Sequence, residues 1–257
     1  MKVRGILALG VVLVGFLITD LVQRTVIAGW VRLRPSRRIP VLGRWIQVLA
    51  WLCVKPLRTI GGVGIEDPPK VVPAEPGHLI VMNHQSIMDI PLMVRSVENG
   101  YPRIVTRARY VRRIPLISHL VRLYQYPVVD PSANPKEVLR SIRSMAKQAR
   151  ESDVPMGLFP EGTRTRDGEI GPFKIRGVSK ILQQRAWTVH IFVVDGYWET
   201  ARFKDFMADM SKIEGKIRYL GTADWDDPKA DPIAFMETVR ERMVEGLAEM
   251  RGLAVEA

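Results

Sequence analysis

Short apolar runs that end in polar loops alternate along most of the chain with segments in which apolar residues recur at helical spacing. Runs of this kind, bounded by Gly, Pro, Asn or Asp, are typical of buried strands. We predict strands over 78–82, 102–107, 126–130, 154–160, 188–196 and 216–223. We predict helices over 91–100, 135–151, 177–187 and 232–253, and a basic amphipathic segment over 108–124. This alternation predicts an α/β fold with a largely parallel central sheet flanked by helices.

The amino-terminal region has a different pattern, with two apolar stretches around a block of arginines. Gly5–Thr19 is uncharged and strongly apolar. As a helix it would span roughly 22 Å, which is short of the ~30 Å hydrocarbon core of a bilayer. Trp45–Val54 is the second stretch, and arginines at positions 32, 34, 37 and 38 lie between the two. The pattern predicts a two-helix hairpin in or on an anionic lipid membrane, with a buried core helix as the alternative for the first stretch.

The flanks of the first apolar stretch indicate where the rest of the chain lies. No cleavage site with small residues follows Gly5–Thr19, so we expect an uncleaved segment rather than a signal peptide. If that segment spans the bilayer, the arginines after it place the remainder on the cytoplasmic face of the cell membrane. We therefore predict a membrane-associated helical part over residues 1–60 and an α/β domain over residues 61–257, with a Gly- and Pro-rich connection over 56–76.

Composition narrows the classes of partner. The net charge of +11 indicates an anionic partner, and the 47% apolar content excludes a disordered chain. The single cysteine, Cys53, excludes an intrachain disulfide, and no Cys/His cluster has the spacing of a zinc site. A nucleic-acid-binding protein would explain the charge, but the apolar amino terminus argues against it and no nucleic-acid motif is present. The expected partner is therefore a lipid membrane with anionic lipids.

The polar loop after the first strand of the α/β domain, Asn83–Asp89, combines a histidine with a carboxylate. The loop allows the Asp89 carboxylate to fold back onto the His84 imidazole. Such a contact fixes the tautomer and leaves the other ring nitrogen free to take a proton from a hydroxyl. As an alternative, Asp89 only caps the following helix, because Pro91 suits a first turn and Ser86 with Asp89 matches a loose capping box.

A second polar loop leaves the strand predicted over 154–160, and it reads FPEGTR from Phe159 to Arg164. The guanidinium fork of Arg164 suits a phosphate, and Lys174 follows within reach of the same loop. Alone, this loop is equally well a tight turn with surface charges. Because the carboxyl ends of parallel strands meet at one edge of a sheet, the two loops are able to converge there. The first loop would then supply His84 and Asp89 as a general base with its partner, and the second loop would supply cations that bind an anion.

Together, NHQSIMD and FPEGTR resemble the first and third motifs of the glycerolipid acyltransferases, in particular the bacterial 1-acylglycerol-3-phosphate acyltransferases. The likeness covers residues 65–196. It implies transfer of an acyl chain from acyl carrier protein or coenzyme A to a lysophospholipid hydroxyl, giving phosphatidate, without a metal or other cofactor. The alternatives are an acyltransferase for another lysolipid, such as a lyso-ornithine lipid, and a non-catalytic membrane-surface protein.

The resemblance also implies roles for particular residues. It makes His84 the general base and Asp89 its orienting carboxylate. The residues that it assigns to the acceptor are Arg107, Glu161, Gly162, Thr163, Arg164 and Lys174. Two positions depart from the family pattern, since Pro131 stands where the second motif has an arginine and Ile191 where the fourth motif has a proline. One phosphate ligand is therefore either absent or supplied by Arg109, Arg112 or Arg113.

Overall fold

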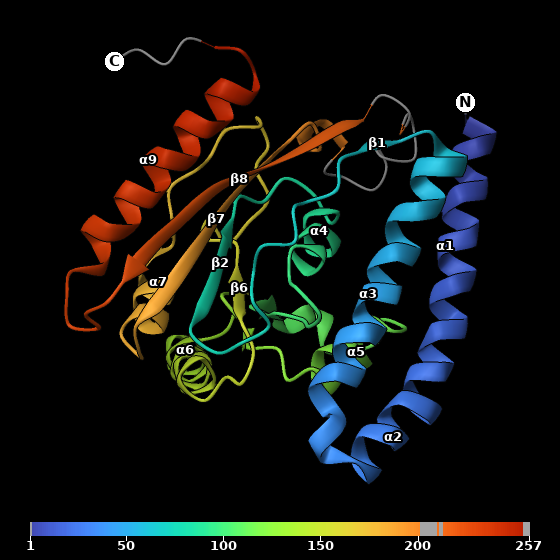
Figure 1. The fold of residues 1–257 in the computed structure, drawn as a ribbon, viewed down its shortest axis with the longest axis horizontal. Coiled ribbons are helices and arrows are strands. Elements are labelled where there is room, and N and C mark those ends of the chain that lie inside the picture. The colour runs from blue at the N-terminus through green and yellow to red at the C-terminus, as the bar shows by residue number, and fades with distance from the viewer. Residues whose placement is uncertain (1, 201–209, 211–212, 254–257) are drawn as a thin grey trace.

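The computed structural model describes residues 2–200, 210 and 213–253, and a six-stranded sheet lies at its centre (Figure 1). In spatial order the strands are β1 (Gly64–Ile65), β8 (Glu214–Trp225), β7 (Trp187–Asp195), β2 (His78–Met82), β6 (Met156–Leu158) and β3 (Arg103–Ile104). All neighbours run parallel except β7 and β8, which are antiparallel. The predicted α/β class with a largely parallel sheet is confirmed.

Helices cover both faces of this sheet. They are α4 (Asp89–Arg95), α5 (Ile117–Leu123), α6 (Pro135–Arg150), α7 (Ile175–Leu182) and α9 (Pro232–Met250). Successive side chains of a strand point to opposite faces. In β2, Leu79 and Val81 join the apolar cluster under α6, α7 and α9, whereas Ile80 and Met82 join the cluster under α4 and α5. The strand is therefore buried on both sides, which explains its unbroken apolar run.

The predicted hairpin lies along one side of the molecule (Figure 1). Helix α1 (Lys2–Val22) continues through a π-helical turn (Gln23–Ile27) into α2 (Ala28–Leu33), and α3 (Arg38–Pro56) returns beside it. The first helix is longer than predicted because the polar residues after Thr19 do not end it. Asp20 pairs with Arg24 at 2.9 Å, and the buried Gln23 hydrogen-bonds Trp45 Nε1 at 3.1 Å.

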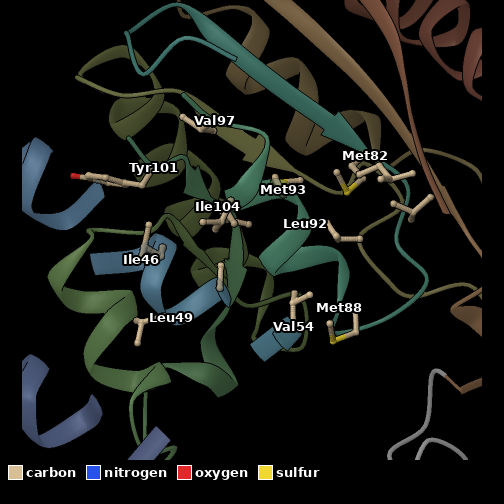
Figure 2. Packing of buried hydrophobic residues seen from close by; sticks show 14 of the residues in the cluster. Ile46, Leu49, Val54, Met82, Met88, Leu92, Met93, Val97, Tyr101 and Ile104 are labelled. Atoms are coloured by element: carbon tan, nitrogen blue, oxygen red, sulfur yellow. The ribbon is translucent and has the colours of Figure 1, made fainter. Parts of the chain in front are cut away.

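Helix α3 is part of the core of the protein. Figure 2 shows its Ile46, Leu49 and Val54 in the same apolar cluster as Leu92 and Met93 of α4, and all five side chains are buried. Burying an aliphatic side chain of this size stabilises the fold by about 1.5–3 kcal/mol. The same apolar cluster thus joins the hairpin to the sheet, and the domain boundary at residue 60 stays a prediction.

Two predicted segments differ from the structure in ways that affect the site. The strand predicted over 102–107 is split into β3, which pairs with β6, and β4 (Thr106–Arg107), which pairs with β5 (Val128–Val129) in a separate sheet. Val105 still donates its N–H group to Gly157 O of β6 at 2.9 Å, whereas the next residue, Thr106, donates to Pro127 O at 2.8 Å, so the chain changes sheets between these two residues. In the connection over 56–76, a π-helical turn continues α3 to Gly61, and β1, which the sequence does not predict, adds an edge strand.

Candidate active site

His84 is the second residue after β2, and Asp89 is the first residue of α4. His84 Nδ1 lies 2.7 Å from Asp89 Oδ2. The same oxygen accepts the backbone N–H groups of Gln85 at 2.7 Å and Ser86 at 2.8 Å, and the Asp89 side chain is fully buried. The carboxylate therefore folds the loop into a tight turn and holds Nδ1 of the imidazole as the donor. The contact between the two side chains is the one that the sequence predicts, and its catalytic role stays a prediction.

Helix capping alone does not account for Asp89. The N-cap position of α4 is Met88, and no side chain caps the helix there. The contact of Asp89 with the Ser86 N–H group is one half of a capping box, whereas Ser86 Oγ lies 3.4 Å from the Met88 nitrogen. All of the N–H groups that Asp89 accepts belong to the loop before the helix. Its main effect is therefore to position the loop that carries His84.

The other side of the imidazole is open. The His84 ring stacks on Phe159, with centroids 4.1 Å apart and planes 17° from parallel. Its side chain is 18% exposed. Nε2 forms no hydrogen bond with any residue in the described part of the chain. The ring is thus held on one edge and one face, and the free nitrogen is available to a substrate hydroxyl.

The loop after β6 is bound to the loop after β2 through Glu161. Its Oε1 accepts the His84 N–H group at 3.0 Å, and its Oε2 accepts the Gly171 N–H group at 3.4 Å. The Thr165 N–H group also donates to His84 O, at 2.8 Å. Burial raises the pKa of Glu161 to about 7, although both hydrogen bonds favour the charged form. Glu161 therefore fixes the two loops against each other, and binding of the acceptor by this side chain stays a prediction.

Cationic side chains gather on the exposed side of the second loop. Arg107 Nη2 donates a hydrogen bond to Gly162 O. The φ of Gly162 is +67°, a conformation that glycine adopts without strain, and a Cβ there would lie 3.2 Å from Lys174 Cγ. Thr163 and Lys174 are exposed and Arg164 is half-buried. The structure thus brings Arg107, Gly162 and Lys174 together beside the loop that holds His84.

Three arginines that could take the place of the absent phosphate ligand of the second motif lie on the turn that follows Arg107. The Arg109 guanidinium lies over the Tyr110 ring, 4.8 Å from its centroid, and Arg112 and Arg113 are exposed. Across the part of the chain that the structure describes, no group of three or more His, Cys, Asp or Glu side chains could hold a metal ion. The expectation that no metal or other cofactor takes part stays a prediction.

Comparison with known proteins identifies the family. Residues 66–194, half of the chain, match the model of the Acyltransferase family, and both loops lie within them. The chain belongs to the acyltransferase family. This match confirms the resemblance seen in the two motifs, and it confirms the expected enzyme class at the level of the family.

The acyltransferase chain also resembles individual proteins. It is 26% identical over 172 residues to a 1-acyl-sn-glycerol-3-phosphate acyltransferase of Cocos nucifera, covering 66% of this chain and 54% of that one. It is 28% identical over 121 residues to a 1-acyl-sn-glycerol-3-phosphate acyltransferase of Limnanthes douglasii, and this match covers 46% of this chain and 41% of that one. The chain thus spans about half the length of the curated relatives that it matches. Its fold matches the crystal structure of the 1-acyl-sn-glycerophosphate acyltransferase PlsC from Thermotoga maritima, with a TM-score of 0.68, 20% identity and coverage of 98% and 100%.

Within the first motif of this acyltransferase, two amides that the sequence analysis does not single out fix the loop. The Asn83 side chain donates to Val194 O at 2.9 Å and accepts the Val194 N–H group at 2.8 Å, which ties the end of β2 to β7. Gln85 Nε2 donates to Asp195 Oδ1 at 3.1 Å, and its Oε1 accepts the Tyr197 N–H group at 3.1 Å. A polar residue next to a buried strand was the available signal, since a buried amide needs partners for both of its ends.

A residue near the carboxyl end also holds the site together. Arg251 donates from Nε to Asp195 Oδ2 at 2.8 Å and from Nη1 to Glu169 Oε1 at 2.6 Å. Its Nη2 donates to Gly168 O at 2.9 Å. One guanidinium group therefore bridges the end of β7 and the loop after β6. No local pattern could predict this, because Arg251 lies far along the chain from both motifs and simply ends an amphipathic helix.

Proposed function

We propose that the protein is a membrane-bound O-acyltransferase that moves an acyl chain from a thioester to the free hydroxyl of a lysophospholipid. The proposed acceptor is 1-acylglycerol-3-phosphate and the product is phosphatidate. The observation that carries this proposal is the His84 ring, held through Nδ1 by Asp89 with Nε2 open beside the cationic loop. Two relatives of the chain are 1-acyl-sn-glycerol-3-phosphate acyltransferases, which supports the choice of acceptor.

In the proposed reaction, His84 first acts as a base and then as an acid. Nε2 takes the proton of the acceptor hydroxyl while its oxygen attacks the thioester carbonyl carbon. The tetrahedral intermediate then collapses, the carbon–sulfur bond breaks, and the imidazolium gives the same proton to the departing sulfur. Asp89 stabilises the imidazolium through its contact with Nδ1, as the carboxylate of a catalytic triad does. The products are an ester and a free thiol, and no acyl-enzyme forms.

The cations of the second loop would hold the acceptor phosphate. The Arg107 and Arg164 guanidinium groups are suited to phosphate oxygens, and Lys174 adds a third positive charge beside Gly162. Fixing the phosphate at this loop would place the free hydroxyl of the glycerol near His84. Positioning of this kind contributes to the rate because it converts an encounter of two molecules into a reaction within one complex.

The hairpin supports association with a membrane. Val3–Leu33 forms 31 residues of helix with a mean hydropathy of 2.4 in its most apolar 18-residue window, of which only 11% is buried. At 1.5 Å per residue this helix is about 46 Å long, which exceeds the hydrocarbon core. Ile87 of the first motif and Ile90, directly after it, are 61% and 38% exposed. We infer that the hairpin and the catalytic edge both face the bilayer, on the cytoplasmic side by the arginine excess after the first helix.

Charge placed on the exposed face of α1 should weaken membrane binding. We expect Leu17→Glu combined with Leu21→Glu to reduce the fraction that sediments with anionic vesicles, because these side chains are 52% and 64% exposed. Activity on vesicle-borne acceptor should fall more than activity on detergent-dispersed acceptor. Ile233→Glu combined with Val244→Glu on α9, where these side chains are 60% and 39% exposed, is the matched control. Undiminished sedimentation of the double variant would show that the anchor lies elsewhere. Deleting residues 1–54 is a poorer test, because it also removes core residues of α3.

Replacing Arg164 with lysine should weaken binding of the acceptor and leave binding of the thioester donor nearly unchanged. Lysine keeps the charge but loses the fork that binds two phosphate oxygens. A charge-assisted hydrogen bond contributes roughly 1.5–3 kcal/mol, so we expect the KM for lysophosphatidate to rise by about ten- to a hundredfold. The KM for the thioester should stay nearly constant. Arg166→Lys, two residues along the same loop and exposed, is the control. Equal loss with an acceptor that has no phosphate would contradict a role for Arg164 in binding phosphate.

An acceptor profile tests the proposed function. The purified protein is given one acyl thioester with lysophosphatidate, a lyso-ornithine lipid or a neutral lysolipid, and the products are identified by mass spectrometry. We expect the highest kcat/KM with lysophosphatidate. A higher value with lyso-ornithine lipid would replace the proposed acceptor, in accord with the departure at Pro131. If no acyl chain is transferred to any acceptor, the alternative of a non-catalytic membrane-surface protein is favoured.

A further inference from the structure

Helix α6 carries a continuous stripe of exposed cations. Its members are Lys136, Arg140, Arg143, Lys147 and Arg150. Their spacing of four and three residues places them on one face of the helix, opposite the buried Met145 and Ala149. The first four form no ion pair with any residue that the structure describes, and Arg150 reaches only the neighbouring Glu151, at 3.7 Å. A solvated helix face ordinarily mixes both signs of charge, so this stripe points to an anionic partner.

The stripe continues onto α7 but not onto α9. Helix α7 packs beside α6 in the same apolar cluster and exposes Arg176 and Lys180. Helix α9 covers the same face of the sheet, yet its exposed positions include Glu237 and Glu245. Two adjacent helices are therefore basic and the third carries acids. A surface divided in this way would attract an acidic partner to α6 and α7 and fix its orientation through repulsion by α9.

The basic stripe begins at the edge of the sheet where the site lies. Helix α6 follows β5, whose partner β4 ends at Arg107, the residue bonded to Gly162. Helix α7 begins at Ile175, directly after the loop that contains Glu161 and Lys174. Both helices then run away from that edge. A partner lying along α6 would therefore have one end next to the loop that holds His84.

We propose that the α6–α7 surface docks an acidic acyl carrier protein that presents the acyl chain as a thioester. This proposal rests on the proposed function and selects one of the two donors. From Lys136 to Arg150 the stripe is about 21 Å long, which is too extended for one nucleotide but suits the length of an acidic helix. Leu139, 46% exposed beside the stripe, supplies an apolar contact within a cationic rim.

The membrane is a poorer match for this surface. Exposed large apolar side chains cluster on α1 and α2, and Leu139 is the single one on α6. Figure 1 shows α1 at one side of the molecule, with α6 below the sheet and α7 towards the opposite side. A protein that enters a bilayer through its hairpin has the α6–α7 surface left for a soluble partner.

Charge reversal tests the proposal. Arg140→Glu with Arg143→Glu is compared with Lys216→Glu with Lys229→Glu, which removes the same charge from β8 and the loop after it. With palmitoyl-acyl carrier protein as donor, we expect the α6 variant to raise the KM roughly tenfold, since like charges across an interface repel. The KM for palmitoyl-CoA should change less than twofold, and the control should leave both donors unchanged. The KM of the wild type for the carrier protein should also rise with salt.

Three results would overturn the docking surface. They are an unchanged KM for the carrier protein, an equal rise for both donors, and a loss of sedimentation with phosphatidylglycerol vesicles in the α6 variant, which would assign the stripe to the membrane. Titration of holo-acyl carrier protein that carries no acyl chain into the wild type and the α6 variant measures binding without catalysis. If the wild type transfers acyl chains from neither donor, the proposed function fails, while this titration still decides the docking surface.

Discussion

Replacing His84 with alanine is expected to lower kcat by about 10²–10⁴-fold, the usual contribution of a general base. The imidazole is the titratable group whose free nitrogen faces the open side of the site, and Asp89 is turned entirely into the loop. The protein should remain folded, because the ring is 18% exposed and its main packing partner is Phe159. The rate is measured as acceptor-dependent release of thiol from an acyl thioester.

Two controls accompany the His84 variant. Its melting temperature and sedimentation with vesicles should match those of the wild type. His78→Ala removes another histidine, at the start of β2 and away from the loop that carries His84, and should leave kcat nearly unchanged. Turnover by His84→Ala close to that of the wild type would remove the proposed mechanism.

Replacing Asp89 with asparagine should have the second-largest effect, a loss in kcat near the lower end of the about 10²–10⁴-fold range of general acid–base catalysis and less than the loss caused by His84→Ala. The carboxylate accepts three donors on Oδ2, namely the His84 ring and the N–H groups of Gln85 and Ser86. An asparagine oxygen in the place of Oδ2 can still accept all three donors, so the ring keeps its orientation. It carries no negative charge, however, and so it stabilises the imidazolium that forms when Nε2 takes the proton less well than the carboxylate does.

The Asp89 variant also separates orientation from capping. A fall in kcat with a melting temperature near that of the wild type supports orientation of the imidazole. An unchanged kcat with a lowered melting temperature would show that Asp89 acts on the stability of α4 and its loop alone.

The elements with a local pattern are those that the sequence predicts well. The apolar run of β2 matches its prediction at both ends, and the amphipathic pattern of α6 differs by one residue. The antiparallel direction of β8 depends on the path of the chain between β7 and β8, and that stretch has no periodic pattern to read. The short strand β1 is defined by its pairing with β8, a contact between distant parts of the chain.

In the site, too, contacts between residues close in the sequence were predictable, whereas contacts between distant segments were not. His84 and Asp89 lie five residues apart, so a local motif was enough to predict their contact. Binding of the acceptor by Glu161 stays a prediction, and the local motif did not predict that its side chain turns inwards to the backbone of His84, a direction set by burial. The bridge from Arg251 to Asp195 joins segments that only the complete fold brings together.

The central claim is direct transfer of the acyl chain by His84 to a lysophospholipid hydroxyl, and one measurement tests it most directly. Thiol release from palmitoyl-acyl carrier protein and from palmitoyl-CoA is followed with and without lysophosphatidate, and the lipid and the protein are then analysed by mass spectrometry. We expect release only when the acceptor is present, one phosphatidate for each thiol, and an unmodified protein. Equal release without acceptor, or an acyl group bound to the protein, would contradict it.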